Sequence, residues 1–206
     1  MSAKGEYQIT EMFEEKVAEY TGAPYAVAVD SCSNAIFLSL MYIGVKNLQI
    51  TIPAKTYMSI PCEIIHAGGK VDFYDYEWSG IYPLHPTPVY DAALRFTHDM
   101  YKRDTFMCIS FTGPNKRLKL GKGGMILTDD KKACDWFKRA RMSGRREMPY
   151  MQDAFDMLGW NFYMLPELAA MGYRLMRGFY DNDKPLQFSD IKGVYSDLSK
   201  FKVYTK

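Results

Sequence analysis

The chain has 206 residues, with 26 basic against 24 acidic side chains and a formal net charge of +2 at pH 7. A nearly balanced charge gives no electrostatic attraction to nucleic acid or to an acidic membrane surface. We therefore expect neither as a partner. The apolar runs are too short to span a bilayer and the N-terminus lacks the apolar core of a signal peptide, which predicts a cytoplasmic protein. The four cysteines and three histidines show no CxxC pair and no ligand spacing, so we expect free thiols and no metal site.

The first third of the chain alternates between helix-type and strand-type patterns. Amphipathic spacing predicts helices, and short apolar runs predict buried strands. In order, the predicted elements are a helix over Ile9–Tyr20, a strand over Tyr25–Val29, a helix over Ala35–Ile43, a strand over Gln49–Pro53, a helix from Thr56 to about His66 and a strand over Lys70–Tyr74. This alternation is typical of an α/β fold with a parallel sheet.

Small polar residues follow the first predicted strand. Ser31, Cys32 and Ser33 stand between that strand and the next helix. They can cap the helix, or they can bind a phosphate together with the backbone N–H groups of the helix N-terminus. Both interpretations remain open from the sequence. In parallel sheets, ligands bind at the carboxyl ends of strands, where these residues and Tyr57 are expected to lie.

The middle of the chain contains an acidic strand end and a lysine-bearing glycine-rich segment. Residues 75–88 show no periodicity, and we interpret them as a connection. We interpret Val89–Ala93 as a strand that carries Asp91. That carboxylate can cap the next element or pair with a cationic ring nitrogen. Lys116 lies between the apolar run that begins at Cys108 and the run Met125–Thr128. A lysine held there can form a Schiff base with an aldehyde cofactor if burial lowers its pKa; the alternative is a solvated basic loop.

The last third contains two predicted helices and a polar end. One helix is expected over Lys131–Met142 and another from about Pro166, whose ring suits a first helical turn. The final stretch is aromatic, polar and aperiodic. We therefore expect a compact α/β domain over residues 1–179, followed by a tail or dimer-wrapping arm over residues 180–206.

Five stretches carry a family resemblance. They read FEEKVAEYTGAPYAVAVDSCSNAI, PAKTY, YDAAL, SFTGPNKRLKLGKGGMILTDD and LGWNFYMLPELAAM, in this order. Together they resemble the DegT/DnrJ/EryC1/StrS family of sugar aminotransferases, which bind pyridoxal 5'-phosphate. The resemblance implies the large domain of a fold-type I aminotransferase, with a mostly parallel central sheet flanked by helices. It ends near Phe179, so we expect the small C-terminal domain of relatives to be missing.

The resemblance also implies a role for each matching residue. Lys116 would form the Schiff base and carry the proton between two carbon centres. Asp91 would pair with the protonated pyridine nitrogen, and Tyr57 would stack on the ring. Four further cofactor-binding residues are implied: Cys32, Ser33 and Ser110 at the phosphate, and Asn161 at the phosphate of the neighbouring subunit. The last role implies a homodimer with shared active sites.

Some family positions differ in this chain. Leu94 stands where a glutamine is usual, Tyr163 where an arginine is usual, and Lys122 where a glutamate precedes the double glycine. The function that the resemblance implies is transfer of an amino group from glutamate to a nucleotide-linked keto sugar. Two alternatives stay open: another pyridoxal phosphate reaction on a small amine, and a non-catalytic binding or assembly module of the same fold.

Overall fold

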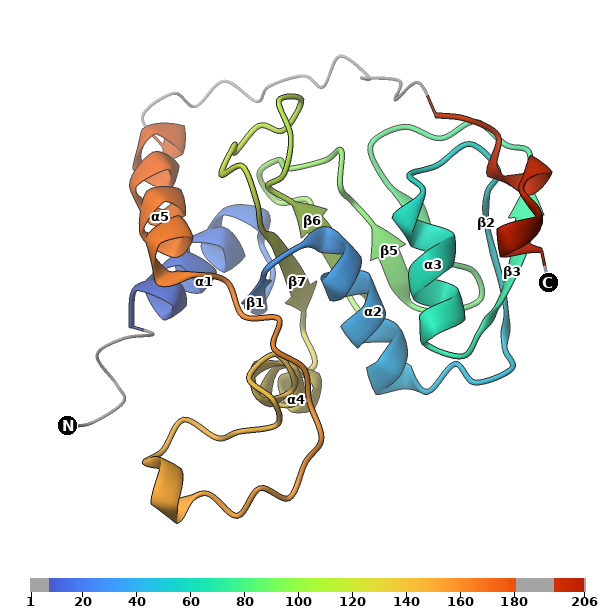
Figure 1. The fold of residues 1–206 in the computed structure, drawn as a ribbon. Coiled ribbons are helices and arrows are strands. Elements are labelled where there is room, and N and C mark those ends of the chain that lie inside the picture. Colours follow the sequence, from blue (N-terminus) through green and yellow to red (C-terminus); the bar gives the residue numbers. More distant parts are fainter. Residues whose placement is uncertain (1–7, 181–194, 206) are drawn as a thin grey trace.

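The computed structural model describes residues 8–180 and 195–205, which form a central sheet with helices on both faces (Figure 1). Within these residues, no helix is both long and apolar enough to cross a membrane. The elements are α1 (Gln8–Thr21), β1 (Tyr25–Val29), α2 (Cys32–Ile43), β2 (Gln49–Pro53), α3 (Ser59–His66), β3 (Lys70–Tyr74), β4 (Tyr82–Pro83), β5 (Val89–Asp91), β6 (Phe106–Ser110), β7 (Gly124–Thr128), α4 (Lys131–Ala140), α5 (Pro166–Tyr180) and the short 3-10 turns η2 (Tyr150–Gln152), η3 (Leu198–Lys200) and η4 (Lys202–Tyr204).

The predicted elements agree with the structure except at some ends. The first three strands have the predicted bounds. Helix α2 begins at Cys32, three residues before the predicted start, because the Ser31 hydroxyl caps it by accepting a 3.2 Å hydrogen bond from the Asn34 N–H. Helix α3 begins at Ser59 and not at Thr56. Strand β4 lies inside the segment interpreted as a connection, because two residues are too short to show a period.

The five-stranded sheet is mixed, so the expectation of a mostly parallel sheet is wrong for it. Its order is β1-β7-β6-β5-β4, and only β5 and β6 pair in parallel. Strand β7 returns beside β6 without a helical crossover, and such a return gives an antiparallel pair. Strands β1, β6 and β5 nevertheless run in the same direction. Strands β2 and β3 form a separate parallel pair, which a bridge between Thr51 and His85 joins to the chain after β4.

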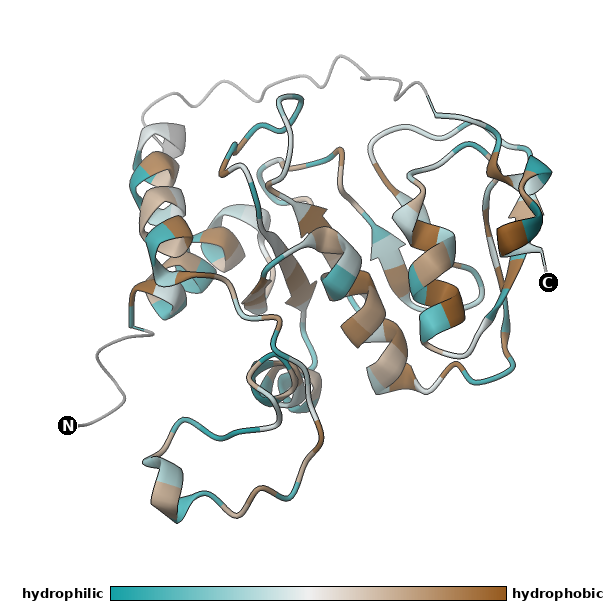
Figure 2. Ribbon diagram, in the orientation of Figure 1, coloured by the Kyte–Doolittle hydropathy of each residue, from teal (hydrophilic) through white to brown (hydrophobic). Residues whose placement is uncertain are grey.

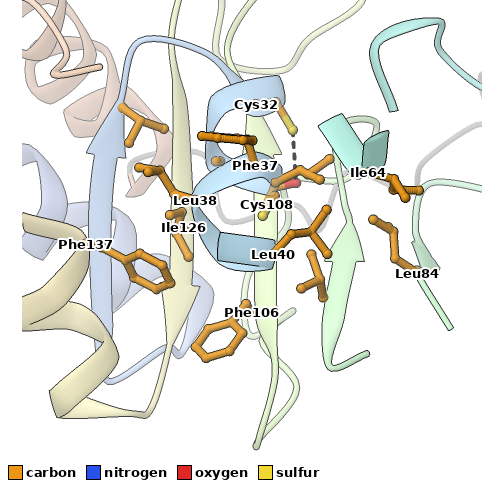
Figure 3. Packing of buried hydrophobic residues seen from close by; sticks show 14 of the residues in the cluster. Cys32, Phe37, Leu38, Leu40, Ile64, Leu84, Phe106, Cys108, Ile126 and Phe137 are labelled. Atoms are coloured by element: carbon orange, nitrogen blue, oxygen red, sulfur yellow. Dashed lines mark hydrogen bonds between the residues drawn. The ribbon is translucent and has the colours of Figure 1, made fainter. Parts of the chain in front are cut away.

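Alternate residues of the central strands enter two different cores. Val27, Cys108 and Ile126 point to the face that α2 and α4 cover. Ala28 and Met107 point to the opposite face, where Phe13 of α1 and Met176 of α5 pack. Because both faces are buried, the strands read as continuous apolar runs in the sequence. Figure 2 shows the hydrophobic residues along α2 and the central strands, and Figure 3 shows the first core, with the thiol of Cys32 directed to Cys108.

A buried ion pair joins the first helix to β1, the first strand in the order of the five-stranded sheet. The Glu14 carboxylate contacts the Arg141 guanidinium and accepts a 2.8 Å hydrogen bond from the Ala28 N–H. Arg141 also donates to the Ala28 carbonyl at 2.6 Å. The glutamate that follows Phe13 in the first quoted motif therefore fixes α1 and the end of α4 to β1.

The last described residues lie beside α3, β2 and β3 (Figure 1). Leu198 is buried, and its N–H donates a 2.8 Å hydrogen bond to the carbonyl of Ala54. This part of the predicted tail therefore packs on its own chain. Residues 181–194 of that tail lie outside the described residues, and the division at residue 179 stays a prediction.

Candidate active site

A cavity of about 540 Å³ opens at the carboxyl ends of the strands that share one direction. Pockets of this size suit a small organic ligand. Six of the seven residues singled out in the sequence line it: Cys32, Ser33, Tyr57, Asp91, Ser110 and Lys116. Asn161 is exposed and does not line this cavity.

The strands explain why residues far apart in the sequence meet here. Cys32 and Ser33 follow β1, and Tyr57 follows β2. Asp91 is the last residue of β5, and Ser110 is the last residue of β6. Because β1, β5 and β6 run in the same direction, their carboxyl ends lie at one edge of the sheet, where ligands of open α/β sheets bind.

Lys116 points its amine into this cavity. Its Nζ donates a 2.6 Å hydrogen bond to the carbonyl of Ala93, just beyond β5. Burial lowers the pKa of Lys116, and the nearby Cys32 and Asp91 oppose that shift. Lys119 is exposed and does not line the cavity, whereas Lys122 lines it from an exposed position with its Nζ 3.9 Å from Asp30. Lys116 is therefore the one lysine of this segment that is partly buried, which disfavours the solvated-loop interpretation.

Asp91 is 3% exposed and held on both carboxylate oxygens. Its Oδ1 accepts a 2.8 Å hydrogen bond from the Ala93 N–H, and its Oδ2 accepts one of 2.8 Å from the Tyr82 hydroxyl. The Tyr82 hydroxyl also lies 2.5 Å from the Thr56 hydroxyl. Burial raises the pKa of Asp91, and the two hydrogen bonds and Lys116 oppose the rise. A cation bound in the cavity next to Asp91 would stabilise the charged form of this carboxylate.

Hydroxyl groups cluster at the N-terminus of α2. The hydroxyls of Ser33 and Ser59 lie 2.7 Å apart, and both residues line the cavity. The thiol of Cys32 instead donates to the Cys108 carbonyl at 3.4 Å, and burial raises its pKa well above the ordinary value. Cys32 therefore offers its backbone and not its thiol to a ligand. A helix N-terminus with adjacent hydroxyls suits a phosphate.

The double glycine brings this turn onto the sheet. A Cβ at Gly124 would lie 2.4 Å from the backbone nitrogen of Cys32, so only glycine allows the contact. Gly123 has φ of +133°, which other residues rarely adopt, and a Cβ there would lie 2.8 Å from Met164. Gly124 therefore allows the Ser31–Cys32 turn to pack against the start of β7.

The sequence patterns missed several cavity residues. Trp78 and Tyr195 line the cavity, and Tyr82 lies behind Asp91, yet all three stand in stretches without periodicity. No motif or spacing marks them, and only their aromatic character gave a signal. Of the family positions that differ, Leu94 is buried outside the cavity lining and Tyr163 does not line it either.

The donor set of the cavity fits pyridoxal phosphate. The group has a phosphate, a ring nitrogen that carries a proton, and an aldehyde that reacts with amines. The cavity offers hydroxyls at a helix N-terminus for the first, the buried Asp91 for the second, and the amine of Lys116 for the third. No further cation is needed to balance Asp91 once a protonated ring lies against it.

Comparison with known proteins finds relatives of low sequence identity. The chain is 25% identical to the spore coat polysaccharide biosynthesis protein SpsC of Bacillus subtilis, over 92% of this chain and 58% of that protein. It is 23% identical to GDP-perosamine synthase of Escherichia coli, over 84% of this chain and 58% of that protein. The chain thus spans about 58% of the length of these relatives.

Solved structures show the same fold. A putative PLP-dependent aminotransferase from Bacillus cereus matches with a TM-score of 0.69 and 17% identity, over 87% of this chain and 60% of that one. The 3-amino-5-hydroxybenzoic acid synthase structure also matches with a TM-score of 0.69, at 19% identity, over 84% of this chain and 56% of that one.

The family model of the DegT/DnrJ/EryC1/StrS aminotransferase family matches residues 3–87 and 97–184. The gap between the two matches contains Asp91, whose place in the site therefore depends on the geometry described above. The matched ranges make up most of the chain, which belongs to the DegT/DnrJ/EryC1/StrS aminotransferase family.

Proposed function

We propose that the protein is a pyridoxal phosphate-dependent aminotransferase that moves an amino group from glutamate to a nucleotide-linked keto sugar. One observation carries the proposal: a partly buried lysine, Lys116, and a buried carboxylate, Asp91, line the same cavity at the carboxyl ends of the strands. Membership of an aminotransferase family supports it.

The cofactor would be held by groups from four strand ends. Ser33, Ser110 and the backbone at Cys32 would bind its phosphate, Asp91 its ring nitrogen, and Tyr57 the face of its ring. Bound there, the cofactor supplies an aldehyde that condenses with amines and a protonated ring that draws electrons from the reacting carbon.

Lys116 would act as nucleophile and then as proton carrier. A lysine attacks a carbonyl only as the neutral amine, and burial lowers its pKa toward that form. The hydrogen bond to the Ala93 carbonyl uses one N–H and leaves the nitrogen lone pair available. Once displaced by an incoming amino donor, the same amine can take a proton from one carbon and deliver it to another.

Asp91 would keep the ring nitrogen protonated. Among the described residues that line the cavity, Asp91 is the only one with a carboxylate, and the hydrogen bonds from Ala93 and Tyr82 fix its direction. A fixed, desolvated carboxylate stabilises a neighbouring cation more strongly than a solvated one.

The substrate class comes from the relatives. GDP-perosamine synthase and the UDP-4-amino-4,6-dideoxy-N-acetyl-beta-L-altrosamine transaminase of Campylobacter jejuni are named for nucleotide-linked sugars. A nucleotide-linked keto sugar is therefore proposed as amino acceptor here, with glutamate as donor and a cytoplasmic location.

We propose a homodimer as the working form. Residues 145–158, here termed the arm, extend away from the body of the molecule below α4 (Figure 1). The arm exposes large apolar side chains, among them Met151 at 90% and Leu158 at 92% exposure. Exposed apolar groups of this size are typical of a surface that another chain covers. Asn161, proposed to reach the partner's cofactor, follows this arm directly.

An absorbance titration with pyridoxal phosphate tests the function. The wild-type protein should develop a band near the visible edge, and borohydride should then fix the cofactor mass to Lys116 in peptide mapping. Lys116→Ala should lose both signals and keep its circular dichroism spectrum. Lys122→Ala, which alters the exposed lysine of the same cavity, should keep both.

Addition of L-glutamate should then convert the band to that of the amine form. Labelling without this conversion would favour a pyridoxal phosphate reaction on another amine. A folded wild-type protein that neither shows the band nor becomes labelled would contradict the proposal and favour a binding or assembly module.

A further inference from the structure

Tyr195 belongs to the cavity although it lies more than sixty positions after the double glycine. Its ring stacks on Trp78 with a centroid distance of 5.8 Å and an interplanar angle of 20°, and both residues line the cavity. Within residues 8–180 and 195–205, the Tyr195 hydroxyl makes no hydrogen bond. Burial raises the pKa of Tyr195, with further contributions from Asp91 and Tyr57. Tyr195 therefore borders the same cavity as the proposed cofactor groups.

Residues 195–205, here termed the strap, are fixed to the segment that follows β2. Leu198 is 5% exposed and its N–H donates to the Ala54 carbonyl at 2.8 Å. Asp197 pairs with Lys55 as an isolated bridge, and the Tyr204 hydroxyl donates to the Met58 carbonyl at 3.4 Å. The strap thus contacts both sides of Tyr57, the residue proposed to stack on the cofactor.

Trp78 connects the strap to Asp91. Its indole N–H donates a 2.9 Å hydrogen bond to the Lys55 carbonyl, which fixes the ring. The indole also contacts the ring of Tyr82, at a centroid distance of 4.6 Å. Tyr82 in turn holds Asp91. One row of aromatic rings therefore runs from Tyr195 to the buried carboxylate.

We propose that the strap completes the cofactor cavity in cis, with Tyr195 as a binding residue for the planar heteroaromatic ring of pyridoxal phosphate. This inference rests on the proposed function. Aromatic rings at the cavity edge gain dispersion and quadrupole contacts from a flat ligand ring. The strap adds a second effect, because it fixes the backbone on either side of Tyr57 and so lowers the ordering cost of binding.

The test is equilibrium binding of pyridoxal phosphate to the full chain, with thermal unfolding measured on each variant. Tyr195→Ala should raise the dissociation constant of pyridoxal phosphate about tenfold, because the variant loses one aromatic contact and the surface area that this contact buries. Tyr195→Phe keeps the ring and should stay within about threefold of wild type. Val203→Ser is the matched control, since Val203 lies on the same strap, is 65% exposed and is not a cavity residue, and it should bind as wild type does.

A chain ending at residue 194 should lose at least as much affinity as Tyr195→Ala. If that shortened chain does not fold, the Tyr195→Ala result decides, because it changes one half-buried ring. Wild-type binding by Tyr195→Ala would overturn the inference while leaving the proposed function intact. Failure of the wild-type protein to bind the cofactor would overturn the proposed function and the inference with it.

Discussion

The hydroxyl of Tyr82 donates a 2.8 Å hydrogen bond to Oδ2 of Asp91, so a buried phenol holds the carboxylate that lines the cavity. The hydroxyl of Thr56 lies 2.5 Å from the same phenol. This pair fixes the direction of the carboxylate and favours its charged form. Burial acts the other way and raises the pKa of Asp91. The charge that Asp91 presents to a ligand therefore depends on two opposing effects, burial and the hydrogen bond from Tyr82.

We expect Tyr82→Phe to weaken pyridoxal phosphate binding by about tenfold, the order of one hydrogen bond to a charged group. The sign of the pH dependence follows from the pKa of Asp91. Loss of the donor raises that pKa further, so the fraction of Asp91 that is charged falls, and it falls most toward acidic pH. The loss of affinity should thus be larger at about pH 6 than at about pH 8. Spectrophotometric titrations at the two pH values measure it.

A pH-independent loss after Tyr82→Phe would contradict this account and would assign Tyr82 a packing role only. Tyr42→Phe is a suitable control. Its hydroxyl donates to Asp130 at 3.2 Å, and neither residue lines the cavity, so the variant loses a similar hydrogen bond to a carboxylate other than Asp91.

Asp91→Asn should reduce amino transfer far more than stability. The amide oxygen can still accept from the Ala93 N–H, and the Tyr82 hydroxyl can accept from the amide nitrogen, so the local contacts survive. The negative charge is lost, and with it roughly 1.5–3 kcal/mol of charge-assisted bonding to a protonated ring, or about a 10- to 100-fold loss in rate. Stopped-flow rates with L-glutamate and melting temperatures measure the two effects. Equal loss of both would indicate a structural role for Asp91.

Most helices and strands could be predicted from the sequence, because the periodicity of apolar residues and the turn residues are local signals. Strand β1 and strand β2 end where Asp30 and Ala54 begin their turns, and the lysine segment lies between two apolar runs as expected. The direction of β7 could not be predicted, since nothing local specifies which strand it pairs with. Tyr82, Trp78 and Tyr195 were missed for a similar reason. They reach the cavity through tertiary packing of aperiodic segments, which leaves no spacing in the sequence.

Gly124→Ala should destabilise the protein. An added Cβ would lie 2.4 Å from both the carbonyl carbon of Ser31 and the nitrogen of Cys32, and backbone cannot move away as a flexible side chain can. Overpacking of this kind costs about 1–3 kcal/mol, measured by urea unfolding. Pyridoxal phosphate affinity should fall as well, because the displaced turn is the proposed phosphate site. Gly178→Ala is the control: it lies in α5 with open space around it, so the same added methyl should be neutral or stabilising. A Gly124→Ala protein as stable as wild type would contradict the close approach.

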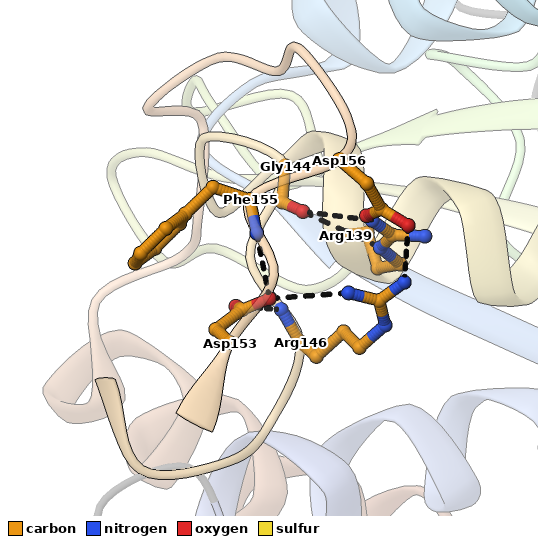
Figure 4. A network of polar contacts seen from close by, with 6 residues as sticks. All are labelled: Arg139, Gly144, Arg146, Asp153, Phe155 and Asp156. Carbon is orange, nitrogen blue, oxygen red and sulfur yellow. Dashed lines mark hydrogen bonds and ion pairs between the residues drawn. The ribbon is translucent and has the colours of Figure 1, made fainter. Parts of the chain in front are cut away.

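We expect the folded arm to be less stable at acidic pH. Figure 4 shows that Asp153 and Asp156 join Arg146 and Arg139 at the base of the arm. Asp153 accepts a 2.8 Å hydrogen bond from the Arg146 N–H, which lowers the pKa of Asp153, and hydrogen bonds from Arg146 and Arg139 lower that of Asp156. A carboxyl group whose folded pKa is depressed stabilises the fold above its unfolded pKa, about 3.9, and loses that contribution as the pH falls toward the folded value.

Protection of the arm against proteolysis should therefore be constant from about pH 7 to about pH 5 and should fall below about pH 4. Asp153→Asn should lower protection already at neutral pH and flatten the acid transition. Glu147→Gln removes an exposed carboxylate of the same arm and should change neither.

Because the arm displays the apolar side chains of the proposed dimer surface, light scattering of Asp153→Asn should show a shift toward monomer. A fully protected arm in Asp153→Asn at neutral pH would show that the backbone turn and not the ion pairs holds it.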